Sequence, residues 1–193
     1  MNRLTATVLL ALALCLSAAA QGVPEKGSHE LGVWTGGGVS VPGGTRDVGI
    51  WNAGLRYGWV LTGQHGPGFM RGNLEYAVDA IPVYMIFQNG ATYAGGFNPF
   101  VAKWNFSGNK KIAPFVELAG GTLFSSDNVP RVSATSVNFT SGAALGLHIF
   151  GRRMNGVIAV RYVHISNAGL ATPNPGINTV QFQIGVNRFS SRH

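Results

Sequence analysis

The chain has 193 residues, a length that suits a single domain. Charged residues make up only 11% of it and hydrophobic residues 46%, and this composition excludes a disordered chain or a polar linker. The formal net charge is +7, but the basic residues are scattered and form no stripe interleaved with aromatics, so the sequence predicts no nucleic-acid partner.

The start of the chain has the pattern of a secretory signal peptide. An apolar core at residues 8–16 follows a short basic start, and the small residues from Ala18 to Ala20 offer a cleavage site. The apolar core is too short for a membrane-spanning helix. We therefore expect residues 1–20 to be a signal peptide and residues 21–193 to form one exported barrel domain. Cys15 is the only cysteine, so the mature domain would contain no disulfide.

Beyond this start, polar and apolar residues alternate with a period of two in eight segments separated by Gly, Pro, Asn and Asp. The segments lie at 29–41, 46–61, 69–86, 91–106, 111–124, 135–150, 156–167 and 178–189. There is no internal run of 18 apolar residues of the kind that a transmembrane helix needs. The pattern therefore predicts an all-β fold with eight antiparallel strands closed into a barrel.

Each segment has one apolar and one polar face, and two kinds of barrel have such faces. In the sixth segment Val137, Phe139 and Leu145 share one face, and Asn138 and His148 share the other. A soluble lipocalin-like barrel turns its apolar face inward, whereas a membrane barrel turns it toward lipid. Alternation alone does not separate the two.

Three features favour the transmembrane β-barrel of a bacterial outer membrane. The segments exceed the 9–11 or so residues needed to cross a bilayer at a tilt. Their polar faces are rich in Gly, Asn, Gln and single charges, as in a narrow polar interior. Aromatic residues also lie near the segment ends, where interfacial girdles form. They are Trp34, Trp59, Tyr93, Trp104, Phe106, Tyr162 and Phe189.

If the amino end of the barrel lies in the periplasm, the odd-numbered segments run outward. The links at 42–45, 87–90, 125–134 and 168–177 are then extracellular, and those at 62–68, 107–110 and 151–155 are periplasmic turns. The two longest links are extracellular in this arrangement, as is usual for outer-membrane barrels. The end of the seventh segment would then lie at the level of the outer leaflet.

Glu75, Asp79 and Glu117 lie within the predicted strands, and each is expected to point into the barrel. A charge inside the barrel needs an opposite charge as a partner, so a structural role is favoured over a catalytic one. The expected pairings are Glu117 with Arg161 or Lys103, and Glu75 and Asp79 with Arg56.

The end of the seventh segment carries residues with catalytic potential. His164 and Ser166 are two positions apart, so they share one strand face, which by parity is the lipid-facing one. A serine hydroxyl is a weak nucleophile until a base removes its proton, and histidine is the usual base. Asn167, Ala168 and Gly169 follow in a corner whose amides and side chain could hold an oxyanion. From the His-x-Ser triplet alone, catalysis is a weak hypothesis.

The string from His164 to Gly169, followed by Asn174-Pro175-Gly176, resembles the signature of the outer-membrane lipid A 3-O-deacylases. The resemblance implies an eight-stranded barrel that hydrolyses the ester-linked 3-hydroxyacyl chain at position 3 of lipid A, at a site on its lipid-facing surface. It makes Ser166 the nucleophile, His164 the general base, and Asn167 and Gly169 candidates for oxyanion stabilisation. It implies no metal and no cofactor. The implied partners are lipid A or lipopolysaccharide and outer-membrane lipids, and a homodimer is left open.

One position departs from the family pattern. A member of that family has a glutamate fourteen residues after the histidine, whereas this chain has Asn178. By parity Asn178 points outward at the start of the strand beside His164, so it keeps the place of a third catalytic residue without its charge. An amide can orient a histidine but cannot stabilise an imidazolium as a carboxylate does. The sequence thus predicts a deacylase-like esterase, with a non-catalytic barrel of structural or lipid-binding role and a soluble lipocalin-like carrier as alternatives.

Overall fold

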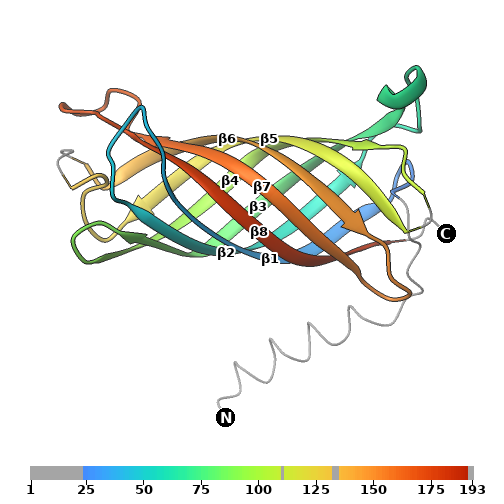
Figure 1. Cartoon of the computed structure of the whole chain (residues 1–193), viewed down its shortest axis with the longest axis horizontal. Helices are drawn as coiled ribbons and strands as arrows, with labels where there is room; N and C mark the ends of the chain where they lie inside the picture. The colour runs from blue at the N-terminus through green and yellow to red at the C-terminus, as the bar shows by residue number, and fades with distance from the viewer. Residues whose placement is uncertain (1–23, 110, 132–134, 191–193) are drawn as a thin grey trace, which may run out of the picture.

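The computed structural model describes residues 24–109, 111–131 and 135–190, which form one closed antiparallel barrel (Figure 1). The predicted signal peptide lies outside these residues. The strands are β1 (His29–Ser40), β2 (Gly49–Val60), β3 (Gly72–Phe87), β4 (Ala91–Phe106), β5 (Ile112–Ser125), β6 (Val137–Ile149), β7 (Asn155–Ser166) and β8 (Ile177–Phe189), with a short helix η1 (Gly68–Met70) between β2 and β3. The predicted fold class is confirmed, and β1 closes the barrel by pairing with β8.

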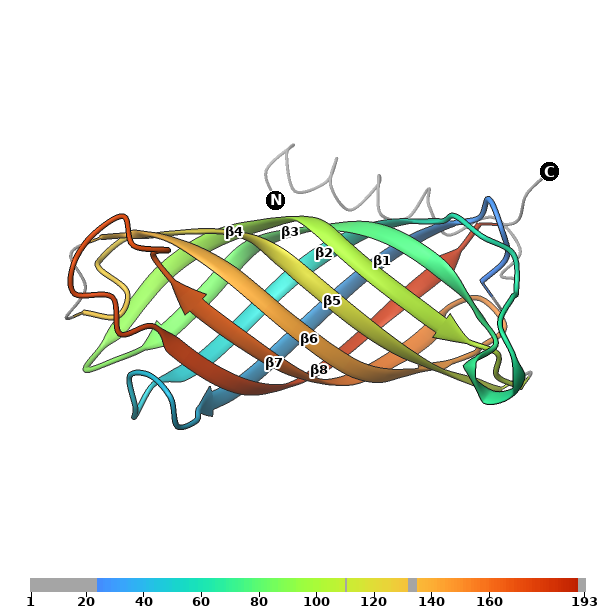
Figure 2. The same ribbon diagram turned by 90° about the horizontal axis from the view of Figure 1, so that it is seen from above.

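The strands cross the barrel wall at a tilt, and the links between them divide into two groups (Figures 1 and 2). The β1–β2, β3–β4, β5–β6 and β7–β8 links lie at one end. The other three links, the start of β1 and the end of β8 lie at the opposite end (Figure 1). In the part of the chain that the structure describes, no helix is long and apolar enough to cross a membrane.

The barrel interior is polar and charged, and its outer wall is apolar. Inside, the guanidinium of Arg56 is held by Asp79, with an Nε–Oδ1 distance of 2.7 Å, and by Glu117. Lys103 likewise lies between Glu30 and Glu75. Outside, large hydrophobic side chains are exposed on all eight strands. This is the distribution of a membrane barrel and the reverse of a lipocalin, so the soluble-carrier alternative is wrong.

Glu75, Asp79 and Glu117 point inward as predicted, but the predicted partners of Glu75 and Glu117 are wrong. Glu117 binds Arg56 rather than Arg161 or Lys103, and Glu75 binds Lys103 rather than Arg56. Alternation predicts on which face of its strand a residue lies. Its partner is decided by the register of the strands and by how far each side chain extends across the barrel interior. Arg161 is engaged elsewhere, because it donates to Gln183 and lies over the Trp34 ring.

Two of the aromatic residues expected in interfacial girdles lie inside the barrel instead. Trp34 and Phe189 are 6% and 1% exposed. The indole of Trp34 fits because its neighbour Gly54 has no side chain, and a Cβ at that position would lie 2.5 Å from the ring. A genuine outer aromatic cluster exists at the end of β2, where the Trp59 ring stacks on Tyr76 with centroids 5.7 Å apart.

Candidate functional site

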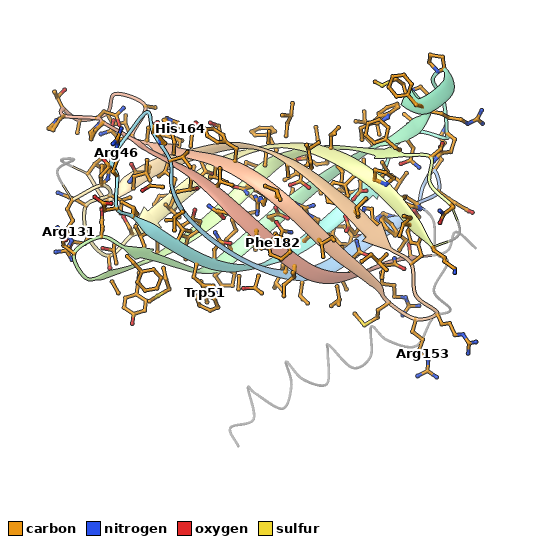
Figure 3. All side chains as sticks on the ribbon, viewed as in Figure 1. Arg46, Trp51, Arg131, Arg153, His164 and Phe182 are labelled. Carbon is orange, nitrogen blue, oxygen red and sulfur yellow. The ribbon has the colours of Figure 1, made fainter. Side chains whose placement is uncertain are left out.

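His164 and Ser166 lie on the outer wall at the end of β7. Their strand alternates strictly, so Val163 and Ile165 are buried while Tyr162, His164 and Ser166 face outward. In Figure 3, His164 lies toward the same end of the barrel as Arg46 and Arg131, and Arg153 marks the opposite end. The predicted parity of the pair is therefore what the structure shows.

A short hydrogen bond joins His164 to Asn178. The two residues are direct partners in the β7–β8 ladder, and His164 Nδ1 lies 2.6 Å from Asn178 Oδ1. An amide oxygen can only accept, so Nδ1 carries the proton and donates it to this bond. The imidazole then presents an unprotonated Nε2, which is the atom that a general base needs.

Ser166 follows His164 on the same face and pairs in register with Phe139 of β6. Its side chain is partly exposed on the outer wall. Within the described residues its hydroxyl has no hydrogen-bond partner. Contacts between nucleophile and base are often long in an unliganded enzyme and shorten when substrate binds.

The corner after Ser166 is organised by the buried side chain of Asn167. Its Oδ1 accepts from the Gly169 N–H at 2.9 Å, and its Nδ2 donates to the Ala171 carbonyl at 2.9 Å. Its own N–H donates to Asn174 Oδ1 at 3.1 Å. Ala168 and Gly169 both have positive φ, so the chain turns sharply beside Ser166. The two candidate oxyanion residues thus lie next to Ser166, and their donors engage partners within the loop.

An apolar groove of about 630 Å³ lies on the outer wall and ends at Tyr162, two residues before His164 on β7, and sequence reasoning missed it. Ala102 of β4 and Ala143 of β6 leave space between the larger Trp104, Leu118 and Tyr162. Ala143 pairs in register with Tyr162, two residue pairs along the ladder from His164 and its partner Ser141. The signal available in the sequence was the small residue Ala143 in an apolar stripe, which becomes a groove only once the strands are in register.

The strand carboxylates do not take part in this site. Glu75, Asp79 and Glu117 are held by Lys103 and Arg56 inside the barrel, whereas His164 lies on the outer wall. Asn178 is therefore the residue that the fold places in contact with the imidazole Nδ1. Among the described residues, no cluster of three His, Cys, Asp or Glu side chains could hold a metal ion.

Comparison with known families agrees with this geometry. The family model described as lipid A 3-O-deacylase (PagL) matches residues 50–187, well over half of the chain and all the residues of the site. The chain belongs to the lipid A 3-O-deacylase (PagL) family. PagL proteins are lipid A deacylases, so membership supports a hydrolase acting on lipid A, and the resemblance seen in the His164–Gly176 string is confirmed.

Solved structures show the same fold. The chain is similar to the outer membrane enzyme PagL, with a TM-score of 0.61 and 22% identity, over 80% of this chain and 97% of that one. It is also similar to the outer membrane protein OprG from Pseudomonas aeruginosa, with a TM-score of 0.53 and 10% identity, over 88% of this chain and 99% of that one. No curated protein sequence matches the chain. The barrel fold and the PagL match fit a protein of the outer membrane.

Proposed function

We propose that this protein hydrolyses the 3-O-linked hydroxyacyl ester of lipid A in the outer leaflet, with Ser166 as the nucleophile and His164 as the general base. The observation that carries the proposal is the 2.6 Å bond from His164 Nδ1 to Asn178, because it leaves Nε2 free to act as a base beside a lipid-facing serine. Polar groups on a lipid-facing wall are costly unless they lie near the headgroups, and this pair lies at the end of its strand.

In the acylation step, Ser166 Oγ attacks the ester carbonyl carbon while His164 Nε2 takes the hydroxyl proton. The resulting tetrahedral intermediate expels the sugar oxygen, which takes that proton from His164. The acyl chain is then esterified to Ser166, and the lipid A has a free 3-hydroxyl group.

In the deacylation step, His164 takes a proton from water, whose oxygen attacks the acyl-enzyme carbonyl. Collapse of the second tetrahedral intermediate returns the proton to Ser166 Oγ and releases a 3-hydroxy fatty acid. Asn178 holds the imidazole in one tautomer and orientation throughout both steps. As a neutral amide it gives the imidazolium less electrostatic stabilisation than a carboxylate would.

The corner at residues 167–169 is proposed to supply the oxyanion donors. Asn167 and Gly169 stand beside the nucleophile, and their N–H groups already take part in hydrogen bonds of 2.9–3.1 Å within the loop. A hydrogen-bond donor aimed at the developing oxyanion stabilises the transition state. Substrate binding would redirect a donor from its loop partner to the oxyanion.

The groove beside Tyr162 and Ala143 is proposed to take an acyl chain of the substrate. It is apolar, it runs along the lipid-facing wall, and its nearest lining residue, Tyr162, is two residues from His164 on β7. A chain bound there would extend from the reacting ester into the hydrocarbon layer. This fits an enzyme that takes its substrate sideways from the membrane rather than from water.

Purified, refolded protein tests this proposal directly. Wild type incubated with lipid A in detergent micelles should release one 3-hydroxy fatty acid per molecule, while Ser166→Ala and His164→Ala should release essentially none. Heat-modifiable mobility on gels must show that all three barrels are folded. A folded wild type that leaves lipid A intact would support the non-catalytic barrel instead.

A further inference from the structure

Asn178 is far more buried than its position on the strand predicts. It shares the lipid-facing side of β8 with Val180 and Phe182, which are 42% and 56% exposed, yet Asn178 is only 7% exposed. A polar side chain at this place would meet lipid headgroups if nothing lay over it. Some other part of the molecule therefore covers it.

The cover is the β1–β2 loop, residues 41–48. The loop is tied to this end of β8 by two backbone hydrogen bonds, from Val41 N–H to the Asn178 carbonyl at 2.8 Å and from Thr45 N–H to the Gly176 carbonyl at 2.9 Å. These bonds continue the β1–β8 ladder past its last pair. The loop is thereby held against the Asn178 side chain.

Gly43 is the loop residue that packs against the Asn178 side chain. Its φ is +105°, a conformation that residues with a side chain rarely adopt. A Cβ at this position would lie 2.8 Å from Asn178 Nδ2, so the Gly43 backbone packs directly on the amide nitrogen. Gly176, with φ of +64°, packs on the other partner, since a Cβ there would lie 3.0 Å from His164 Cε1.

The orientation of this amide determines whether His164 can act as a base. With Oδ1 toward His164, Nδ1 is protonated and Nε2 is free. With Nδ2 toward His164, the amide would donate to Nδ1 and the proton would lie on Nε2, which could not then accept one from Ser166. The two oxygens of a carboxylate are equivalent acceptors, so a carboxylate has no wrong orientation. A chain with Asn at this position needs a contact that fixes the orientation of the amide.

We propose that the β1–β2 loop, through the backbone of Gly43, is a positioning element of the catalytic site that holds the Asn178 amide with Oδ1 toward His164. Gly43 acts through Asn178 and does not itself touch the reacting atoms. This inference rests on the proposed Ser166–His164 mechanism, but not on lipid A being the substrate.

The test measures how fast Ser166 reacts with a lipid-chain fluorophosphonate. In that reaction Ser166 Oγ bonds to phosphorus, fluoride leaves, and His164 takes the hydroxyl proton, so the rate reports the base without requiring lipid A. Gly43→Ala should slow labelling on the order of 10²-fold, the usual effect of displacing a catalytic group by about 1 Å. Gly90→Ala is the matched control, because Gly90 also has a positive φ (+118°) in a loop at this end, but a Cβ there would meet only the mobile end of Arg131.

A double-mutant cycle separates positioning from a general structural effect. In an Asn178→Ala background there is no amide to displace, so adding Gly43→Ala should change the labelling rate less than about twofold. Full additivity of the two changes, or a Gly43→Ala rate equal to wild type, would overturn the proposal. Gly90→Ala should have no effect in either background.

A second variant serves if Gly43→Ala fails to fold. Replacing residues 41–47 by Asn-Gly, a two-residue hairpin turn between the paired Ser40 and Val48, removes the cover without adding atoms beside the amide. Its labelling should also fall by at least tenfold, and an unchanged rate would contradict the proposal. A wild type that does not react at Ser166 would instead refute the proposed mechanism, which keeps the two failures distinct.

Discussion

His164 and Asn178 face each other directly across the β7–β8 ladder, and their Nδ1 and Oδ1 atoms are 2.6 Å apart. The contact depends on the register of β7 against β8 as well as on the spacing of the two residues in the sequence. A register shift of one residue would turn the Asn178 side chain into the barrel. The proposed third catalytic residue is thus an amide that needs no rearrangement to hold the imidazole.

Asn178→Asp should increase the turnover rate, by about tenfold at neutral pH. Aspartate is isosteric with asparagine, so the 2.6 Å contact is kept while a negative charge is placed against the developing imidazolium. The gain should fall well short of the roughly four decades seen for the opposite change in serine proteases, because much of that loss comes from the wrong tautomer. Asn178→Ala should lower the rate, and kcat measured on lipid A micelles checks both. A slower Asp variant would show that the imidazole does not gain charge in the rate-limiting step.

Ala143→Phe should impair hydrolysis of lipid A much more than hydrolysis of a short, water-soluble ester. Phenylalanine would fill the groove beside Tyr162, where the acyl chain is proposed to bind, without touching His164 or Ser166. We expect KM for lipid A to rise about tenfold, equal to about 1.4 kcal/mol of binding. Ala53→Phe, on the outward face of β2, is the matched control and should leave both activities unchanged. Equal loss on both esters would argue against an acyl groove here.

Arg56→Met should destabilise the barrel without changing the activity of the molecules that remain folded. The change leaves the carboxylates of Asp79 and Glu117 buried without their cation. Removing one partner of such a buried pair costs about 3–5 kcal/mol. Urea unfolding followed by tryptophan fluorescence measures the loss, with exposed Arg46→Met as the control. If the free energy of unfolding decreases by less than about 1 kcal/mol, the two carboxylates take up protons or water at little cost.

The sequence predicts the fold well because the membrane imposes a strict rule on every strand. A residue on the wrong face would place a charge in lipid, so alternation reports the wall and the interior directly. The inward placement of Glu117 and the outward placement of Ser166 both follow from parity. Trp34 and Phe189 lie inside because their parity places them on the inner face, and parity is a better guide than nearness to a strand end.

The sequence predicts less about contacts across the barrel interior and about contacts between loops and strands. The partners of Glu117 and Glu75 depend on reach across the barrel interior, which no period-two pattern encodes. The cover over Asn178 depends on Gly43, some 135 positions away in the chain, brought there by closure of β1 on β8. The groove likewise forms only when the five strands that line it, β3 to β7, are in register.

Mass spectrometry of lipid A from cells that express the wild type or Ser166→Ala in their outer membrane tests the central claim most directly. The account predicts that lipid A from wild-type cells lacks one 3-hydroxyacyl chain and that lipid A from Ser166→Ala cells is intact, with both barrels folded at equal levels. Intact lipid A in both would contradict it, as would equal deacylation by the two proteins.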